Sequence, residues 1–391
     1  MVVVTISTMM MLSTRTHVGA VPTTAKAPAA KVGASPTSQA DRAGQGTFRT
    51  GRPNSVIYEE TVPFVTRSGA QLLLDGQPFR FTGLNIYNAN NLAGCWYPLG
   101  AGPTLDNALT AIGPGQKVFR AWFFQSMATT NGQRDWSGFD HTLMVARAHG
   151  ERVIATLGND WNDCDGWAAA PRYKTESWYR SGYRTTQVQG ELSTYRTWVA
   201  DVVARYRNNP TIMAWQLMNE ASTPSDNGTG ACTLTSAISM RSFAADVAGL
   251  IKSIDGNHLV SLGTVGGGEC GTAGADYQYV HSVPAIDLCE MHDYGSPNAL
   301  MPTDPTNGLP RRIAQCRALN KPLFMGEIGI QVSTVGSVTN RASAFRAKLG
   351  AQFGAGVVGE LIWDWCDADQ VAYSSYELTP GDPSLQVLSA F

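Results

Sequence analysis

The chain has 391 residues, of which 43% are hydrophobic and 15% charged, and its formal net charge is −2. A chain of this length and apolar content can bury a large core, as one α/β barrel or as two smaller domains. No block of Lys and Arg stands out. Nucleic acid is therefore excluded as an expected partner, because phosphate binding needs clustered cations.

The first 55 residues differ in composition from the rest. The apolar run Met1–Leu12 is too short to span a bilayer and resembles the apolar region of a secretory signal. Residues 28–55 are rich in Ala, Pro, Thr, Gly and Ser, which is typical of a disordered linker. We expect a signal peptide at 1–27, a linker at 28–55 and one folded domain at 56–391. The protein should then be secreted or associated with the cell wall, without a stable membrane span.

Seven cysteines are present, and export would permit up to three disulfides. Cys232 and Cys270 both lie in Gly-rich segments, and we predict that they pair. Cys289 lies inside an apolar strand and is expected to be a buried free thiol. The chain has no CxxC pair, so we expect no structural zinc site and assign no metal and no cofactor.

From residue 56 onward, short apolar runs alternate with helical segments. The strand candidates are Phe79–Asn85, Lys117–Phe123, Arg152–Leu157, Ile212–Asn219, His258–Gly263, Ile286–His292, Pro322–Glu327 and Gly359–Trp363. The helix candidates are Thr104–Ile112, Phe139–His149, Gly190–Tyr206, Ser236–Ile254, Ala273–Val280, Leu309–Leu319, Val338–Phe353 and Pro383–Ala390. This order predicts a (β/α)8 TIM barrel, with a doubly wound sheet as the alternative. The barrel is favoured because polar residues gather at the C-terminal ends of the strands, where barrel active sites form.

Two of these strand ends carry a glutamate. Glu220 ends the fourth strand and Glu327 the seventh, and these ends face each other across an eight-stranded barrel. A retaining glycosidase needs two carboxyl groups about 5 Å apart, one to protonate the leaving oxygen and one to attack the anomeric carbon. The pair therefore predicts a retaining glycosidase.

The two carboxyl groups of such an enzyme need different environments. The acid requires a raised pKa and the nucleophile a lowered one. Arg120 and Tyr294, expected on the same rim, would hold Glu327 ionised, and His292 would orient or tune Glu220.

Two further acidic features are interpreted as structural. Glu290 lies two residues before His292 and should share its inward face, as a buried partner of Arg120 or His292. The loop from Asp160 to Gly166 hints at calcium, but it lacks the Gly and Glu that an EF-hand pattern requires.

These motifs resemble glycoside hydrolase family 5 over residues 64–370. The similar segments are Trp215-Gln-Leu-Met-Asn219-Glu220, Met325-Gly-Glu327-Ile-Gly329, His292-Asp-Tyr294, Phe119-Arg120-Ala121 and Ile362-Trp363. The resemblance implies that Glu220 is the acid/base and Glu327 the nucleophile. It implies supporting roles for Arg120, Asn219, His292 and Tyr294, with Asn219 bonding the sugar 2-hydroxyl. Expected substrate-binding residues are Asn85, Tyr87, Trp122, Asn159, Trp161 and Trp363.

The sequence indicates the glycosidase reaction more clearly than it indicates the substrate. Gly83–Tyr87 and Gly158–Trp161 resemble the β-mannanase branch, so β-1,4-mannan or a β-glucan is the favoured polysaccharide or oligosaccharide partner. The family usually reads Asn-Glu-Pro, and mannanases often add an Arg, whereas here Glu220 precedes Ala221-Ser-Thr. This departure keeps open a β-galactofuranosidase or other furanosidase acting on cell-wall galactan. We expect a monomer.

Two functions from other classes fit the sequence less well. A non-catalytic carbohydrate-binding barrel would usually have lost one of the two glutamates. A metal-dependent barrel hydrolase would need His-x-His after the first strand, but the chain has six His and no such pair.

Overall fold

The predicted strands and helices are present in the computed structural model of the chain. It describes residues 62–90, 103–115, 117–161, 164–165, 174–188, 190–366 and 375–391. The predicted signal peptide at 1–27 and linker at 28–55 lie outside these residues.

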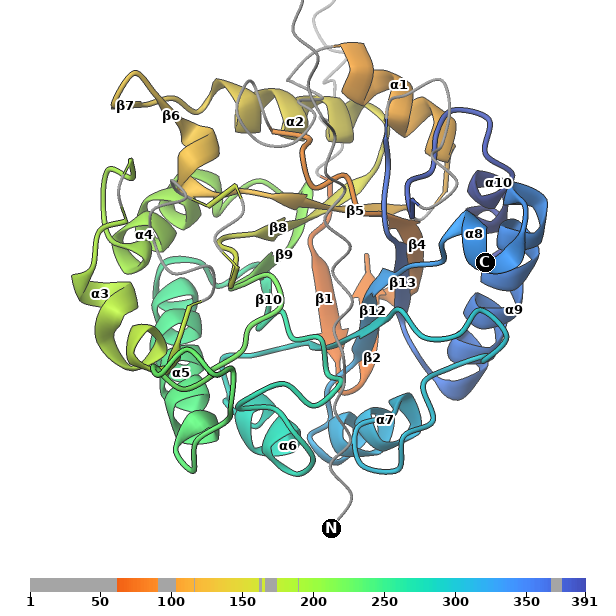
Figure 1. The fold of residues 1–391 in the computed structure, drawn as a ribbon. Helices are drawn as coiled ribbons and strands as arrows, with labels where there is room; N and C mark the ends of the chain where they lie inside the picture. Colours follow the sequence, from red (N-terminus) through yellow and green to blue (C-terminus); the bar gives the residue numbers. More distant parts are fainter. Residues whose placement is uncertain are drawn as a thin grey trace, which may run out of the picture. The chain divides into compact units, whose positions relative to one another are not determined.

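Eight parallel strands within the described residues close into a barrel (Figure 1). They are β4 (Phe81–Leu84), β5 (Val118–Trp122), β8 (Arg152–Thr156), β9 (Ile212–Gln216), β10 (Leu259–Ser261), β11 (Cys289–Asp293), β12 (Leu323–Ile328) and β13 (Gly359–Ile362). They form two four-stranded sheets, β10-β9-β8-β5 and β11-β12-β13-β4. Parallel bridges Asn85↔Arg120 and Ser261↔Leu288 join the two sheets at both seams. The predicted (β/α)8 barrel is confirmed, and the doubly wound alternative is wrong.

Helices surround the strands as an outer ring (Figure 1). The predicted ones are α1 (Pro103–Ile112), α2 (Ser137–Ala148), α4 (Tyr195–Tyr206), α5 (Ser236–Ile254), α6 (Asp276–His281), α7 (Leu309–Ala318), α9 (Val338–Ala355) and α10 (Ser384–Leu388). Short helical turns that were not predicted are Gln125–Ala128, Trp178–Gly182, α3 (Tyr183–Thr185) and α8 (Val332–Val335). Every helix in the described part of the chain is too short or too polar to cross a membrane.

An antiparallel sheet that the sequence analysis missed precedes the barrel. It consists of β1 (Val65–Ser68), β2 (Gln71–Leu74) and β3 (Gln77–Phe79). Its apolar side chains pack into one buried cluster with residues at the N-terminal ends of the barrel strands, such as Phe81 and Val118. The sheet therefore caps the end of the barrel opposite the predicted site. A small hairpin, β6 (Thr129–Thr130) and β7 (Gln133–Arg134), was also missed.

The barrel interior changes from apolar to polar along the strand direction. Side chains alternate along a strand, so every second residue points into the barrel. Each successive inward residue belongs to the next layer toward the C-terminal ends of the strands. The lower layer includes Val118, Ala214, Leu259 and Leu288, all buried among apolar neighbours. Two residues further along the same strands stand Arg120, Gln216, Ser261 and Glu290, which are also fully buried. A hydrogen-bonded polar layer thus lies directly beneath the C-terminal rim.

The structure confirms one cysteine prediction and overturns another. Cys232 and Cys270 form the predicted disulfide. Cys289 is not a free thiol but is bonded to Cys316 of α7, with a Cα–Cα distance of 6.3 Å. Residues of β11 alternate between the interior and the helices, so Cys289 points away from Glu290 and toward α7.

Gly83 in β4 provides a test of the barrel packing. A Cβ at this position would lie 1.7 Å from the carbonyl oxygen of Val118 in β5, so an alanine would force the two strands apart. We expect Gly83→Ala to lower the free energy of unfolding by about 3 kcal/mol, measured by urea denaturation.

Gly249 in α5 is the matched control, because a Cβ there meets nothing within 4 Å. Gly249→Ala should raise the free energy of unfolding by about 0.5–1 kcal/mol, since alanine is the better helix former. Equal effects of the two substitutions would contradict the strand contact.

Candidate active site

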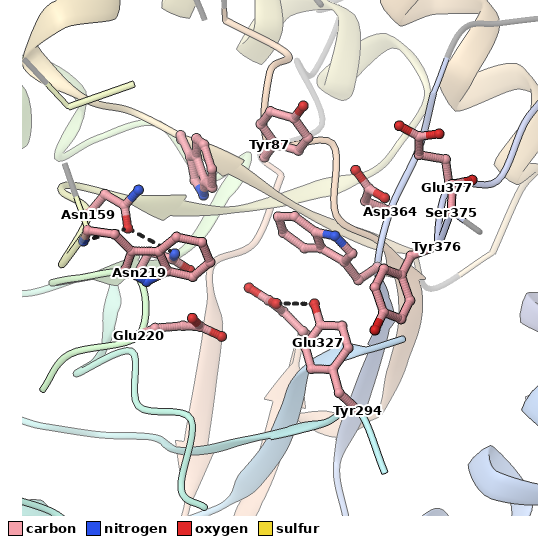
Figure 2. A pocket seen from close by; sticks show the side chains of 13 residues that line it. Tyr87, Asn159, Asn219, Glu220, Tyr294, Glu327, Asp364, Ser375, Tyr376 and Glu377 are labelled. Carbon is pink, nitrogen blue, oxygen red and sulfur yellow. Dashed lines mark hydrogen bonds between the residues drawn. The ribbon is translucent and has the colours of Figure 1, made fainter. Parts of the chain in front are cut away.

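A pocket opens at the C-terminal ends of the barrel strands (Figure 2). Nine residues predicted from the sequence line it: Tyr87, Trp122, Asn159, Trp161, Asn219, Glu220, Tyr294, Glu327 and Trp363. Two further predicted residues, Arg120 and His292, are buried directly behind the wall, where they contact the two glutamates. Nine of the thirteen residues that line the pocket, and both of these buried residues behind it, were therefore predicted from the sequence.

Glu327 is held by one cation and one hydroxyl group. Arg120 Nη1 donates to its Oε1 at 2.8 Å, and the Tyr294 hydroxyl donates to its Oε2 at 2.5 Å (Figure 2). Only 4% of the Glu327 side chain is exposed. Burial of the hydroxyl group and the nearby Glu327 and Glu220 carboxylates raise the pKa of Tyr294 well above its usual value, although 39% of the residue is exposed, so this phenol remains a hydrogen-bond donor.

Glu220 sits just beyond the end of β9 with a left-handed backbone, at a φ of 52°. Non-glycine residues adopt this conformation at a cost, and they do so at active sites as well as in turns. A ring nitrogen of His292, Nδ1, lies 2.9 Å from Glu220 Oε1. The Glu220 side chain is 17% exposed, so it is the more accessible of the two carboxyl groups.

The two carboxyl groups point toward one another across the pocket (Figure 2). One oxygen of Glu220, one of Glu327 and a ring nitrogen of His292 all lie within 4.8 Å of one another. Retaining glycosidases place their carboxyl groups about 5–5.5 Å apart, whereas inverting enzymes need about 6.5–9.5 Å to admit a water. The observed spacing fits direct attack on a sugar carbon.

His292 lies among several carboxylates and carries a proton. Burial alone would lower its pKa, but Glu327, Glu220 and Glu290 together raise the pKa to about 10. The cluster of Glu220, His292 and Glu327 has a spacing that could hold a metal ion. The hydrogen bonds of these residues with one another and with Arg120 and Tyr294 account for their positions, and we assign no metal to them.

The pKa of Glu327 differs from the expectation that a nucleophile has a lowered value. Burial raises the pKa of Glu327, while the positive charges of His292 and Arg120 oppose that rise. The sequence could indicate the partners of Glu327 but not how completely the barrel would remove it from water. The ion pair with Arg120 therefore offsets a desolvation cost rather than producing a strongly acidic group.

Arg120 connects the walls of the site. Its guanidinium donates to Glu327, to Asn85 Oδ1 at 3.0 Å, to Gln216 Oε1 at 2.8 Å and to Asn219 Oδ1 at 2.5 Å. Asn85 also donates to the backbone oxygen of Gly326 at 2.9 Å. Asn85 is completely buried and does not line the pocket, so its predicted place against the substrate is corrected to that of a support for Arg120.

Aromatic rings form a second wall of the pocket. Tyr87 stacks on Trp363 with ring centroids 5.5 Å apart and lies 4.6 Å from the Trp122 ring. Trp161 lines the same pocket near Asn159, whose Oδ1 accepts a hydrogen bond from Asn219 Nδ2 at 3.1 Å. Aromatic faces beside hydrogen-bonding amides suit the apolar faces and hydroxyl groups of a sugar ring.

Four pocket residues were not predicted: Asp364, Ser375, Tyr376 and Glu377. Asp364 directly follows Trp363, and its position at a strand end could have indicated it. Burial, followed by the charges of Glu377 and Glu327, raises its pKa well above the usual value. The other three lie beyond the last barrel strand in a segment without a motif, so no sequence signal marked them.

Known proteins with similar sequences and structures are glycosidases. A family model described as "GH family 5 beta-mannosidase-like" matches residues 124–349. Mannan endo-1,4-beta-mannosidase A of Hypocrea jecorina is 27% identical over 337 residues, which cover 78% of this chain and 70% of that protein. Mannan endo-1,4-beta-mannosidase 1 of Oryza sativa subsp. japonica is 26% identical over 373 residues, covering 82% of each chain.

A similar fold is found in the crystal structure of the endo-1,4-beta-mannanase from Rhizomucor miehei. The TM-score is 0.62 with 18% identity, over 84% of this chain and 99% of that one. This likeness concerns the barrel, while the family model also spans β9 and β12, the strands of both glutamates. The chain is a glycosidase that hydrolyses O-glycosyl bonds, and it belongs to glycoside hydrolase family 5, in its β-mannosidase-like group.

Proposed function

We propose that Glu220 is the acid/base and Glu327 the nucleophile of a retaining glycoside hydrolase. The observation that carries this assignment is the spacing of at most 4.8 Å between one oxygen of each carboxyl group. Their environments support the division of roles. Glu327 is buried and fixed by Arg120 and Tyr294, as a nucleophile must be, while Glu220 is more exposed and can exchange protons.

In the first step, a Glu327 oxygen attacks the anomeric carbon while protonated Glu220 gives its proton to the leaving glycosidic oxygen. The bond between the anomeric carbon and that oxygen breaks, and a glycosyl ester forms on Glu327. In the second step, ionised Glu220 takes a proton from water, whose oxygen attacks the same carbon and releases Glu327. Two inversions leave the anomeric configuration unchanged.

The surrounding residues support these steps. Arg120 and the Tyr294 hydroxyl bond the two oxygens of Glu327 and so orient it toward the sugar. Asn219 lines the pocket beside Glu220, and we assign its side-chain amide to the sugar 2-hydroxyl. Trp363, with Tyr87 stacked on it, offers an aromatic face on which the ring at the cleavage site could rest.

We propose β-1,4-mannan as the substrate. Relatives that are 26–27% identical over most of this chain are named mannan endo-1,4-beta-mannosidases, which favours mannan over β-glucan and over furanosides. The sequence after Glu220, Ala221-Ser222-Thr223, lacks the Arg expected in mannanases. This difference lies beside the acid/base and is the sequence feature that does not match the mannan assignment.

Glu327→Gln should lower kcat by roughly 1,000-fold or more, because an amide cannot form the glycosyl ester. The variant should still fold, since glutamine fills the same space, but its melting temperature should fall because the buried Arg120 loses its charged partner. Hydrolysis by purified wild-type and variant protein, with thermal melts of both, would check this. Retained activity on the true substrate would show that the nucleophile is wrongly assigned.

A panel of mannan, cellulose, β-1,3-glucan and galactofuranan should show hydrolysis of mannan in preference to the other three. Proton NMR of the first products should show the β anomer of the newly formed reducing end, because double displacement retains configuration. Preferred release of galactofuranose would reject the mannan assignment. An inverted first product would reject the two-step mechanism, whichever sugar is cleaved.

We also propose that the chain is exported. The disulfides Cys232–Cys270 and Cys289–Cys316 support an oxidising compartment, where such bonds persist. When the full chain is expressed in a secreting host, the mature protein should be recovered from the medium with an N-terminus near residue 28. Retention of the whole protein in the cell with Met1 intact would contradict export.

A further inference from the structure

Glu290 is a fully buried carboxyl group that the proposed mechanism does not use. It lies on β11 two residues before His292 and faces the barrel interior, beneath the pocket. His292 Nε2 lies 3.3 Å from Glu290 Oε1, while His292 Nδ1 lies 2.9 Å from Glu220 Oε1. One imidazole therefore connects a carboxyl group inside the barrel with the proposed acid/base.

The position of Glu290 is fixed from three sides. Gln216 Nε2 donates to both of its oxygens, at 2.7 and 2.6 Å, and the Ser261 hydroxyl donates to Oε2 at 2.8 Å. All of these donors are neutral, so His292 provides the cationic contact. The carboxylate is thus held where it faces the imidazole rather than the solvent.

The glycine before the nucleophile makes room for this pair. A Cβ at Gly326 would lie 2.0 Å from Glu290 Oε1 and 2.9 Å from His292 Nε2. Any larger residue at 326 would push the two groups apart. Gly326 on β12 therefore leaves the space that the Glu290 carboxyl group on β11 occupies. This fit supports a role for the contact between Glu290 and His292.

On the basis of the proposed function, we propose that Glu290 is a positioning residue that keeps His292 protonated and aimed at the acid/base Glu220. With Glu290 ionised, both ring nitrogens of His292 carry a proton and donate to carboxylates. Without that charge, the Nε2 proton has no anionic acceptor, and the ring can become neutral while keeping Nδ1–H on Glu220.

Other charged groups face His292 as well. Glu220 follows β9, Glu327 lies on β12, and Glu269 lies in the loop after β10. The cation Arg120 on β5 pairs with Glu327. His292 Nδ1 is 3.5 Å from Glu327 Oε2, against 2.9 Å from Glu220, and Glu327 has two other strong partners. A change in the charge of His292 should therefore affect Glu220 more than Glu327.

The dependence of kcat/KM on the leaving group distinguishes this positioning role from a purely structural one. Aryl glycosides with a dinitrophenyl leaving group need no protonation, whereas phenyl glycosides need the acid. Glu290→Gln should lower kcat/KM for the phenyl glycoside about 10-fold to 100-fold and for the dinitrophenyl glycoside less than about 3-fold. An equal loss for both substrates would overturn the proposal.

Two matched variants accompany this measurement. Ser261→Ala removes a neutral hydrogen bond to Glu290 but leaves its charge, so the ratio of the two kcat/KM values should not change. Glu220→Gln should show the same selective loss in a stronger form. If Glu220→Gln lowers kcat/KM equally for both substrates, the proposed function is wrong. If only Glu290→Gln lowers kcat/KM equally for both, the proposed role of Glu290 is wrong.

Nitrogen-15 NMR of the histidine rings tests the protonation directly. At pH 8, His292 should be doubly protonated in the wild type and mainly singly protonated in Glu290→Gln. A neutral His292 in the wild type would overturn the proposal even if the variant fails to fold. A doubly protonated His292 in a folded Glu290→Gln would overturn it equally.

Discussion

The buried ion pair between Arg120 and Glu327 is the interaction on which the site depends. The guanidinium is inaccessible to solvent and bonds three side chains besides Glu327, which come from the ends of β4 and β9. A buried ion pair adds little net stability, because desolvation of the two charges offsets their attraction. Its value here is geometric: five planar donors hold the carboxylate and its neighbours at fixed angles. The packed barrel provides the stability of the fold. Part of that stability offsets the cost of burying Arg120, which fixes the pocket wall.

The strands could be predicted because each is a short apolar run that ends in a polar residue. This pattern follows from burial on both faces, and it also located the carboxyl groups, since strand ends are the rim of the site. The antiparallel sheet before the barrel was missed because its strands are short and lie next to a polar segment. Its turn at Asp75 and Gly76, both with positive φ, is a hairpin signal that the sequence does contain.

Other properties of the site depend on distances that a sequence does not contain. Cys289 was expected to be free because its strand looked uniformly buried, yet alternation along β11 turns it toward α7 and Cys316. Asn85 was expected to touch substrate because it ends a strand, yet Arg120 occupies its amide oxygen. In both cases the residue and its element were identified correctly, and the neighbour that decides its role came from another part of the chain.

The charges around the site explain why the two glutamates differ. Arg120 and His292 are cations, while Glu220, Glu290 and Glu327 can each carry a negative charge. If all five are ionised, the cluster has one negative charge in excess, and in a weakly screened interior this excess favours the uptake of one proton. Glu290 and Glu327 are each held in place by several hydrogen-bond donors. Glu220 has the greatest exposure of the three. Glu220 is therefore the carboxyl group that a substrate oxygen or a water can reach, while Arg120 and Tyr294 hold Glu327 in place.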